Sequence, residues 1–168
     1  MARALIVGCG CRGQALARAL TAAGHAARGT TRRPERLATI EAADAEAVVA
    51  DPDRLATLTP SLEGVSVLCW LMGTAVGGAQ AAAALHGPRL ESMLEAIVDT
   101  PVRGVVYEAA GSVDPARLAG GAALVRHAAE THRIPVELVV QDPADHVRWL
   151  EAAVGAVQAV LTRQVAAG

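Results

Sequence analysis

The sequence predicts an α/β protein built on a doubly wound, parallel sheet of six strands, and three observations support this prediction. Short apolar runs alternate with segments of helical periodicity along the whole chain of 168 residues. The connections between these segments are short, and prolines mark many of their boundaries. Strict alternation of this kind requires parallel strands joined by right-handed crossovers. We expect the strand order 3-2-1-4-5-6 and a single domain that comprises residues 1–168.

The individual elements follow from periodicity and from the turn residues between them. Strands are expected at about 3–8, 25–30, 45–50, 65–71, 102–108 and 136–141. Helices are expected at about 12–23, 34–42, 53–59, 88–99, 115–132 and 143–164, with a Gly/Ala-rich passage over 73–87. Five prolines can each be the first residue of a helix, where a missing N–H is harmless: Pro34, Pro52, Pro88, Pro115 and Pro143. The residues directly before three of them are candidate N-caps: Asp51, Asp114 and Asp142.

The glycine-rich turn after the first strand carries the clearest functional signal. Residues 4–7 form an apolar run typical of a central parallel strand, and a G-x-G-x-x-G follows. Gly8 suits a tight turn, Gly10 allows a pyrophosphate to approach closely, and Gly13 allows the helix to pack on the strand. The helix N-terminus offers free N–H groups and the positive end of the helix dipole. The order strand, glycine turn, helix therefore predicts dinucleotide binding; a purely structural glycine turn is the alternative.

The end of the second predicted strand favours NADP over NAD. An NAD site usually carries Asp or Glu about 20 residues beyond the glycines, where it binds the ribose 2′-hydroxyl. Here the nearest acid is Glu35, and hydroxyl and guanidinium groups occupy the position: Thr30, Thr31, Arg32 and Arg33. A guanidinium binds a phosphate bidentately, whereas a carboxylate would repel it. The alternatives are that the two arginines are merely solvated and that the cofactor is NAD.

Further cofactor contacts are expected from three other places in the chain. Cys11 and Arg12 lie inside the glycine motif, and Arg12 either reaches the phosphates or points to solvent. Asp51 follows the third strand on the adenine side, unless it only caps the next helix. We expect the end of the fourth strand to lie beside the adenosine ribose and the pyrophosphate, at Leu71, Met72 and Gly73.

Composition limits the remaining classes of function. A net charge of −2 gives no indication of nucleic acid or an anionic membrane as a partner. We see neither a signal peptide nor a run of apolar residues long enough to span a bilayer, and expect a soluble cytoplasmic protein. The three cysteines, Cys9, Cys11 and Cys69, are too few for a disulfide framework and lack a nearby histidine for a metal site, so buried thiols are expected.

Four stretches together suggest a family: the glycine loop, GTTRRPERL, VVADPDRL and GVSVLCWL. Over Ala2 to Gln141 the chain resembles the NAD(P)-binding core of the atypical and extended short-chain dehydrogenase/reductases, the NAD-dependent epimerase/dehydratase group. The resemblance implies a Rossmann fold, an NAD(P) cofactor, and a Tyr-x-x-x-Lys pair with Ser or Thr for proton and hydride chemistry.

The chain departs from this family pattern in its chemistry. All fifteen basic residues are arginine, so no Tyr-x-x-x-Lys can exist. The only tyrosine, Tyr107, is followed four residues later by Gly111. Ser112 stands near the position of the family's serine but has no base beside it. After the sixth strand we expect one helix in place of the substrate region of the extended enzymes, and we assign no catalytic residue.

These departures favour a module that binds or senses the dinucleotide. The alternatives are an NADP-dependent oxidoreductase or epimerase-like enzyme with non-standard catalytic residues, and an active site completed by a partner chain.

The last helix carries a wide apolar stripe: Val147, Leu150, Val154, Val157 and Leu161, widened by Ala153, Ala156 and Val160. The stripe either covers the sheet beside the sixth strand or forms the interface of a homodimer.

Overall fold

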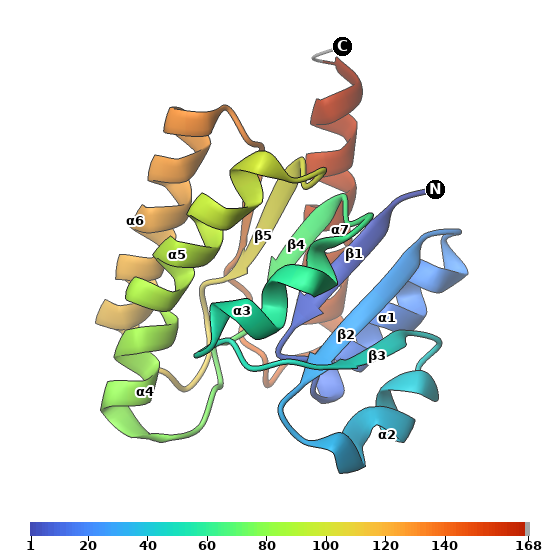
Figure 1. Ribbon diagram of the computed structural model, residues 1–168, viewed down its shortest axis with the longest axis horizontal. Coiled ribbons are helices and arrows are strands. Elements are labelled where there is room, and N and C mark those ends of the chain that lie inside the picture. Colours follow the sequence, from blue (N-terminus) through green and yellow to red (C-terminus); the bar gives the residue numbers. More distant parts are fainter. Residues whose placement is uncertain (167–168) are drawn as a thin grey trace.

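The computed structural model describes residues 1–166 and contains a six-stranded sheet in the order β3-β2-β1-β4-β5-β6 (Figure 1). The strands are β1 (Arg3–Val7), β2 (Ala26–Thr31), β3 (Glu46–Val49), β4 (Val67–Trp70), β5 (Gly104–Glu108) and β6 (Val136–Val139). All neighbouring strands pair in parallel. The predicted fold class and strand order are therefore confirmed.

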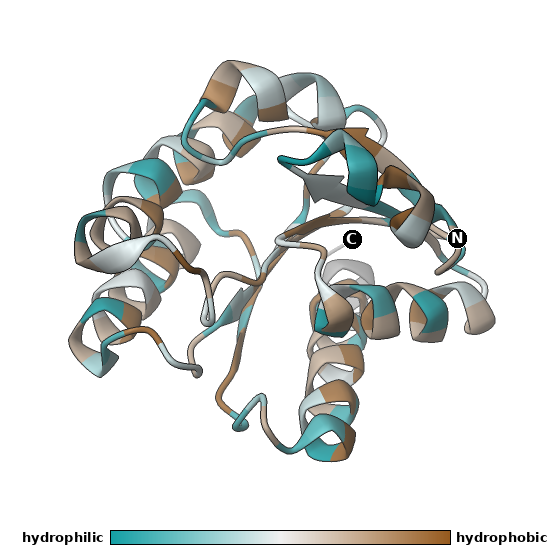
Figure 2. Cartoon of the chain, turned by 90° about the horizontal axis from the view of Figure 1, so that it is seen from below, coloured by the Kyte–Doolittle hydropathy of each residue, from teal (hydrophilic) through white to brown (hydrophobic). Residues whose placement is uncertain are grey.

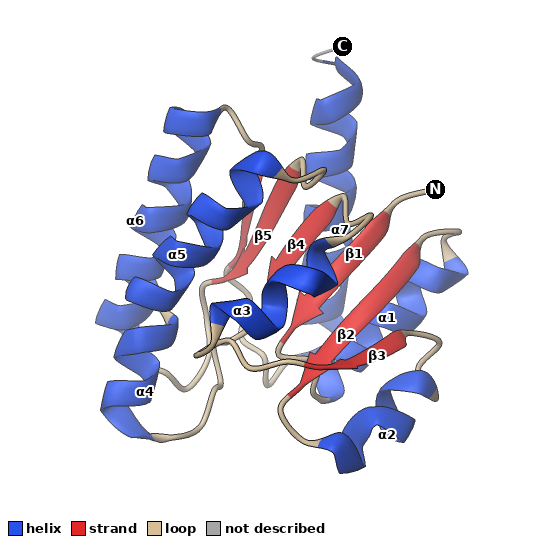
Figure 3. Cartoon of the chain, in the orientation of Figure 1, coloured by secondary structure: helices blue, strands red, loops and turns tan. Residues whose placement is uncertain are grey.

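Helices cover both faces of this sheet (Figure 3). They are α1 (Cys11–Ala22), α2 (Leu37–Glu41), α3 (Leu55–Leu58), α4 (Gly78–Leu85), α5 (Pro88–Ala96), α6 (Pro115–His132) and α7 (His146–Ala166). Short 3-10 turns extend three of the connections: η1 (Pro34–Arg36), η2 (Thr59–Leu62) and η3 (Ile97–Asp99). None of the helices within residues 1–166 is long and apolar enough to cross a membrane.

Alternate strand residues supply two separate cores, one on each face of the sheet. Leu5, Trp70 and Tyr107 belong to the core that α5 and α6 cover. Ile6 and Cys69 belong to the opposite core, which α1 and α7 cover. Because both faces are buried, the central strands have nearly continuous apolar sequences, and they appear largely brown between the helices in Figure 2.

The helix that sequence periodicity does not predict is α4, which lies inside the Gly/Ala-rich passage. Its sequence, GAQAAAAL, has no polar face, so no amphipathic pattern marks it. Alanine has the highest intrinsic helix propensity, and this run of alanines forms two turns of helix. Its carboxyl end brings Leu85 and His86 into the core beside β4 and β5.

Two of the expected helix starts lie too early in the chain. Helix α3 begins at Leu55 rather than at Pro52, and Asp51 accepts a hydrogen bond from the Asp53 N–H at 2.9 Å, so it forms a turn instead of a helix cap. Helix α7 begins at His146, because Asp142 likewise turns the chain by accepting the Ala144 N–H at 2.9 Å. The other expected helix cap is confirmed, since Asp114 accepts the Ala116 N–H at the start of α6.

Most of the apolar stripe of α7 covers the sheet. The buried residues of the helix in the core beneath β4, β5 and β6 are Trp149, Ala153, Ala156, Val157 and Val160. Leu150, Val154 and Leu161 are half-buried against the same core, and Val147 is 69% exposed. The packing of α7 on the sheet therefore accounts for most of the stripe, and Val147 lies outside that contact.

Candidate cofactor site

A cavity of about 370 Å³ opens at the carboxyl ends of β1, β2, β3 and β4. In open α/β sheets, ligands bind in the crevice outside these ends, at the point where the strand order reverses. Most of the predicted cofactor-binding residues line the cavity: Gly8, Gly10, Arg12, Gly13, Thr30, Thr31, Arg32, Arg33, Leu71 and Met72. The sequence interpretation did not include the other lining residues: Cys9, Arg36, Ala50, Pro52, Thr74, Ala75 and Val76.

The three motif glycines have different surroundings. Gly8 adopts φ +86°, and a Cβ there would lie 2.5 Å from the carbonyl oxygen of Leu71. A Cβ on Gly13 would lie 3.0 Å from Cγ2 of Ile6, so the close packing of α1 on β1 needs glycine there. Gly10 has φ −83°, and a Cβ there would have no protein atom within 4 Å. Neither packing nor backbone conformation within the chain requires glycine at position 10.

The N-terminus of α1 opens onto this cavity. Gly10 is its N-cap, no side chain caps the helix, and no acidic residue lies in its first turn. The first N–H groups of a helix have no partner within the helix, and the helix dipole makes this end positive. The geometry is that of an anion-binding helix N-terminus.

Arginines gather at the adjoining end of β2, and their partners differ. Arg32 pairs with Asp51 (Nε–Oδ1, 3.4 Å) and Asp53 (Nη2–Oδ2, 3.7 Å) from the segment after β3. Arg33 and Arg36 line the cavity, and within residues 1–166 neither forms a salt bridge. The two acids close to Arg32 thus belong to the segment after β3. Their distance from the glycines along the chain does not predict them.

A neighbouring hydroxyl group holds the backbone of Arg33 in the turn after β2. Thr31 Oγ1 accepts the Arg33 N–H at 3.1 Å, which closes a short turn after the strand. Thr30 is 3% exposed, and its carbonyl accepts the Cys9 N–H at 3.3 Å, linking β2 to the glycine turn. Asp51 itself does not line the cavity, although its neighbours Ala50 and Pro52 do.

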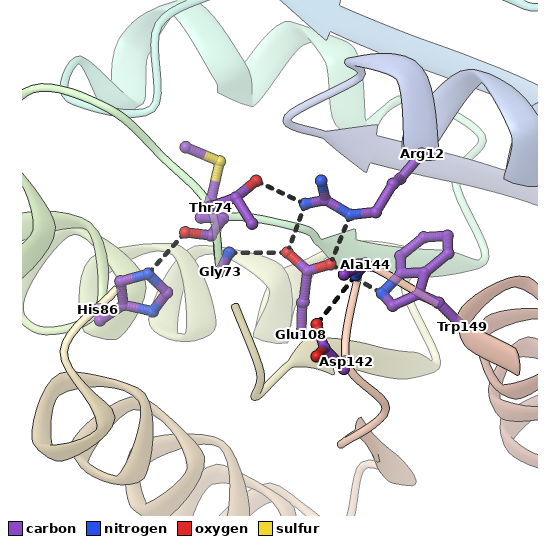
Figure 4. A network of polar contacts seen from close by, with 9 residues as sticks. Arg12, Gly73, Thr74, His86, Glu108, Asp142, Ala144 and Trp149 are labelled. Carbon is purple, nitrogen blue, oxygen red and sulfur yellow. Dashed lines mark hydrogen bonds and ion pairs between the residues drawn. The ribbon is translucent and has the colours of Figure 1, made fainter. Parts of the chain in front are cut away.

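On the other side of the glycine turn, the half-buried Arg12 forms an ion pair with the buried Glu108 (Figure 4). Its Nη2 lies 3.0 Å from Oε1 of Glu108, and its Nε lies 3.1 Å from Oε2. Nη2 also donates to Thr74 Oγ1 at 2.8 Å, and the guanidinium carbon lies 5.5 Å from the centre of the Trp149 ring. Arg12 thus lines the cavity with a side chain that is 20% exposed, while Glu108 and Thr74 hold its Nε and Nη2.

Glu108 has no exposed surface, and both of its carboxylate oxygens are fully used. Oε1 also accepts the Gly73 N–H at 2.8 Å, and Oε2 also accepts Trp149 Nε1–H at 2.9 Å. Gly73 therefore belongs to this network rather than to the cavity lining. The sequence VVYE carries a signal for this network, since its charged residue ends a buried strand. A fully buried glutamate needs a partner.

The cysteines divide between the core and the surface. Cys9 and Cys69 are buried, and burial raises the pKa of each thiol to about 12. Cys11 is exposed, contrary to the expectation of three buried thiols, and lines a second cavity of about 200 Å³ with His146 and Trp149. Within residues 1–166, no cluster of three His, Cys, Asp or Glu side chains could hold a metal ion.

Tyr107 does not reach the cavity. It is fully buried on the α5–α6 face, and its hydroxyl lies 2.6 Å from Nδ1 of His86. His86 Nε2 lies 2.9 Å from the Met72 carbonyl, which can only accept, so Nε2 carries the proton and Nδ1 accepts from the tyrosine. Burial lowers the pKa of His86 and raises the pKa of Tyr107. Ser112 is exposed and does not line the cavity either.

No protein-family model matches the sequence. No curated protein matches it either. Solved structures do match its fold. A Bacillus halodurans protein described as an NAD-dependent epimerase/dehydratase superimposes with a TM-score of 0.70 at 16% identity, over 84% of this chain and 71% of the other.

Two further similar structures were solved with a dinucleotide. The Citrobacter sp. triphenylmethane reductase complexed with NADP(H) has a TM-score of 0.61 at 21% identity, over 84% of this chain and 49% of the other. The Bacillus cereus UDP-glucuronic acid 4-epimerase, in a complex that includes NAD, has a TM-score of 0.63 at 16% identity, over 81% of this chain and 55% of the other. The chain thus spans about half the length of these two proteins. At these identities the similarity shows a shared fold.

Proposed function

We propose that the protein binds NADP(H) in the cavity at the carboxyl ends of β1, β2 and β4, and that it acts as a module that binds or senses the dinucleotide. Binding here means that the pyrophosphate lies against Gly10 and the N-terminus of α1, with the adenosine half toward the end of β2. The fold supports this assignment, because the similar structures from Citrobacter sp. and Bacillus cereus contain NADP(H) and NAD.

The observation that carries the proposal is the environment of Gly10. The glycine is not required by the protein's own packing, and its missing Cβ leaves open space beside an uncapped helix N-terminus. A ligand that must approach the backbone closely accounts for glycine at this position. The ligand should be anionic, because the helix dipole and the free N–H groups both favour negative charge.

The preference for NADP over NAD rests on the arginines at the end of β2. Arg33 and Arg36 line the cavity, and the acids after β3 pair with Arg32 instead. Two guanidinium groups at the adenosine end match a 2′-phosphate, which accepts charge-assisted hydrogen bonds. Asp51 pairs with Arg32 and does not line the cavity, so its carboxylate does not face the position proposed for the 2′-phosphate.

The absence of hydride-transfer machinery supports a binding role over catalysis. Tyr107 is fully buried with its hydroxyl on His86, and lysine does not occur in the sequence. Glu108 lies at the end of β5, but it is buried and its oxygens are saturated, so it cannot exchange a proton with a bound molecule.

Calorimetry with NADPH and NADH tests the proposal. We expect NADPH to bind more tightly; equal affinities, or tighter binding of NADH, contradict the assignment. Gly10→Val should abolish binding of both cofactors and leave the protein folded, because φ at this position suits any residue and the new side chain enters open space.

Gly120→Val provides the matched control. Gly120 also has open space at its Cβ position, but it lies on the exposed side of α6 and does not line the cavity. This variant should bind NADPH as the unchanged protein does. Normal binding by Gly10→Val would show that the glycine turn has only a structural role.

A further inference from the structure

The cavity covers only one half of the dinucleotide crevice. In this type of sheet, the glycine turn holds the pyrophosphate, and the two mononucleotide halves lie on opposite sides of the switch point. The described lining comes from the glycine turn and from the segments after β2, β3 and β4. None of the lining residues in the described part of the chain belongs to β5, β6 or α7. Its volume is near the lower limit for sites that enclose a small ligand.

Arg12 occupies the place where the crevice would continue toward β5. Its guanidinium connects three elements: α1, from which it projects, the loop after β4 through Thr74, and the end of β5 through Glu108 (Figure 4). Trp149 of α7 lies against the guanidinium and donates to the same carboxylate. Four segments of the chain therefore meet at the nicotinamide side of the glycine turn.

This arrangement cannot open without removing the counter-charge of Glu108. Glu108 has no exposed surface with Arg12 in place, and if Arg12 moved away to admit a ring, its carboxylate would keep only the Gly73 and Trp149 hydrogen bonds. An uncompensated buried charge is strongly unfavourable. The planar, bidentate contact of Arg12 also holds its side chain in one orientation.

We propose that Arg12 makes the site specific for the 2′-phospho-ADP-ribose part of the cofactor and leaves the nicotinamide ring outside the protein. This inference rests on the proposed function and adds the chemical class that the site recognises. Oxidised and reduced cofactor then bind alike, and so does any ligand that carries adenosine, its 2′-phosphate and the pyrophosphate. The protein responds to the amount of the NADP(H) pool rather than to its redox state.

A comparison of ligands on the unchanged protein tests the inference. Calorimetry should give Kd values for NADPH, NADP⁺ and 2′-phospho-ADP-ribose that agree within about threefold, since each tenfold difference reflects about 1.4 kcal/mol of additional contact. In saturation-transfer NMR of bound NADPH, the adenine protons should receive magnetisation from the protein and the nicotinamide protons should not. Binding of NADPH more than about tenfold tighter than the fragment, or saturation of the nicotinamide protons, overturns the inference and leaves the proposed function standing. Failure of all three ligands to bind overturns both.

Two variants assign the effect to Arg12. The double variant Arg12→Met with Glu108→Gln removes both charges together, so no unpaired charge stays buried, and nicotinamide protons should then become saturated. Thr74→Val is the matched control, because it removes one contact of Arg12 and leaves the ion pair with Glu108 in place. Its nicotinamide protons should stay unsaturated. An unchanged pattern in the double variant would show that Arg12 does not exclude the ring.

Discussion

The two halves of the crevice use charged residues in opposite ways. At the end of β2, Arg33 and Arg36 are exposed, line the cavity and form no salt bridge within residues 1–166. At the end of β5, Glu108 is completely buried, and Arg12, Gly73 and Trp149 satisfy both of its oxygens. An exposed, unpaired guanidinium remains available to an anion. A buried, saturated pair instead fixes the elements that it joins.

Because of this difference, we expect ligand affinity and the stability of the fold to depend on different sides of the crevice. Changes on the β2 side should alter ligand affinity and leave the fold intact, because the side chains are solvated there. Changes on the β5 side should alter stability first, because each partner of the network compensates a group that has lost its water. Measurements of stability and of ligand affinity on variants of each side test this division.

The largest expected effect is on stability, from Arg12→Met. The variant leaves the Glu108 carboxylate buried without its counter-charge, and the cost of breaking a buried pair in this way is about 3–5 kcal/mol. Equilibrium unfolding in urea measures it. The double variant with Glu108→Gln should recover much of the loss, since a neutral amide oxygen can still accept from Gly73 or Trp149. A single variant as stable as the unchanged protein would show that the network contributes little.

A smaller effect is expected on NADPH affinity from the arginines at the other side. Arg33→Ala and Arg36→Ala together should weaken NADPH binding by about 1.5–3 kcal/mol, the scale of lost hydrogen bonds to a charged group, and leave NADH binding almost unchanged. Arg32→Ala is the comparison on the same turn. Because Arg32 is already paired with Asp51 and Asp53, its removal should cost less. Equal losses of NADPH and NADH affinity would place the arginines away from the 2′-phosphate.

A pH-dependent effect is expected from His86, which is buried and contacts Met72 and Tyr107. Burial lowers its pKa below the ordinary 6.5, so on acidification the unfolded chain takes up a proton that the folded protein does not bind. The free energy of unfolding should therefore fall as the pH drops below about 6.5, by at most about 1.4 kcal/mol per pH unit, until the folded-state pKa is reached. The negative charge of Glu108 and the hydrogen bond to Met72 oppose the shift and limit its size.

Urea unfolding at several pH values compares the unchanged protein with His86→Gln. A glutamine amide can donate to the Met72 carbonyl and accept from Tyr107, as the neutral imidazole does, but it does not titrate. The fall in stability below pH 6.5 should be smaller in this variant. Equal curves for both proteins would show that His86 is not protonated on unfolding in this range.

The sequence was sufficient for the features that depend on local chemistry. Alternating apolar runs gave the strands, and the glycine spacing identified both the tight turn at Gly8 and the close packing at Gly13. Features that depend on distant pairs were missed. Arg12 and Glu108 are 96 residues apart, and only the fold brings them into contact. Asp51 and Asp53 reach Arg32 because β2 and β3 are neighbours in the sheet, which no spacing rule along the chain expresses.

The smallest effect is expected on self-association, which stays a prediction. The part of α7 that a second copy could contact is its exposed side near Val147 and the half-buried Leu150, because Val157 is only 2% exposed and belongs to the core. A dimer through this helix predicts a mass of twice 17.1 kDa in light scattering at micromolar concentration. Val147→Glu should then give the monomer mass without loss of stability, whereas Val157→Glu would unfold the protein and decide nothing.

Gln158→Glu places the same charge on an exposed position of the helix and should remain dimeric. A monomer mass for the unchanged protein rejects the dimer and leaves the packing of α7 on the sheet as the full reason for its apolar stripe.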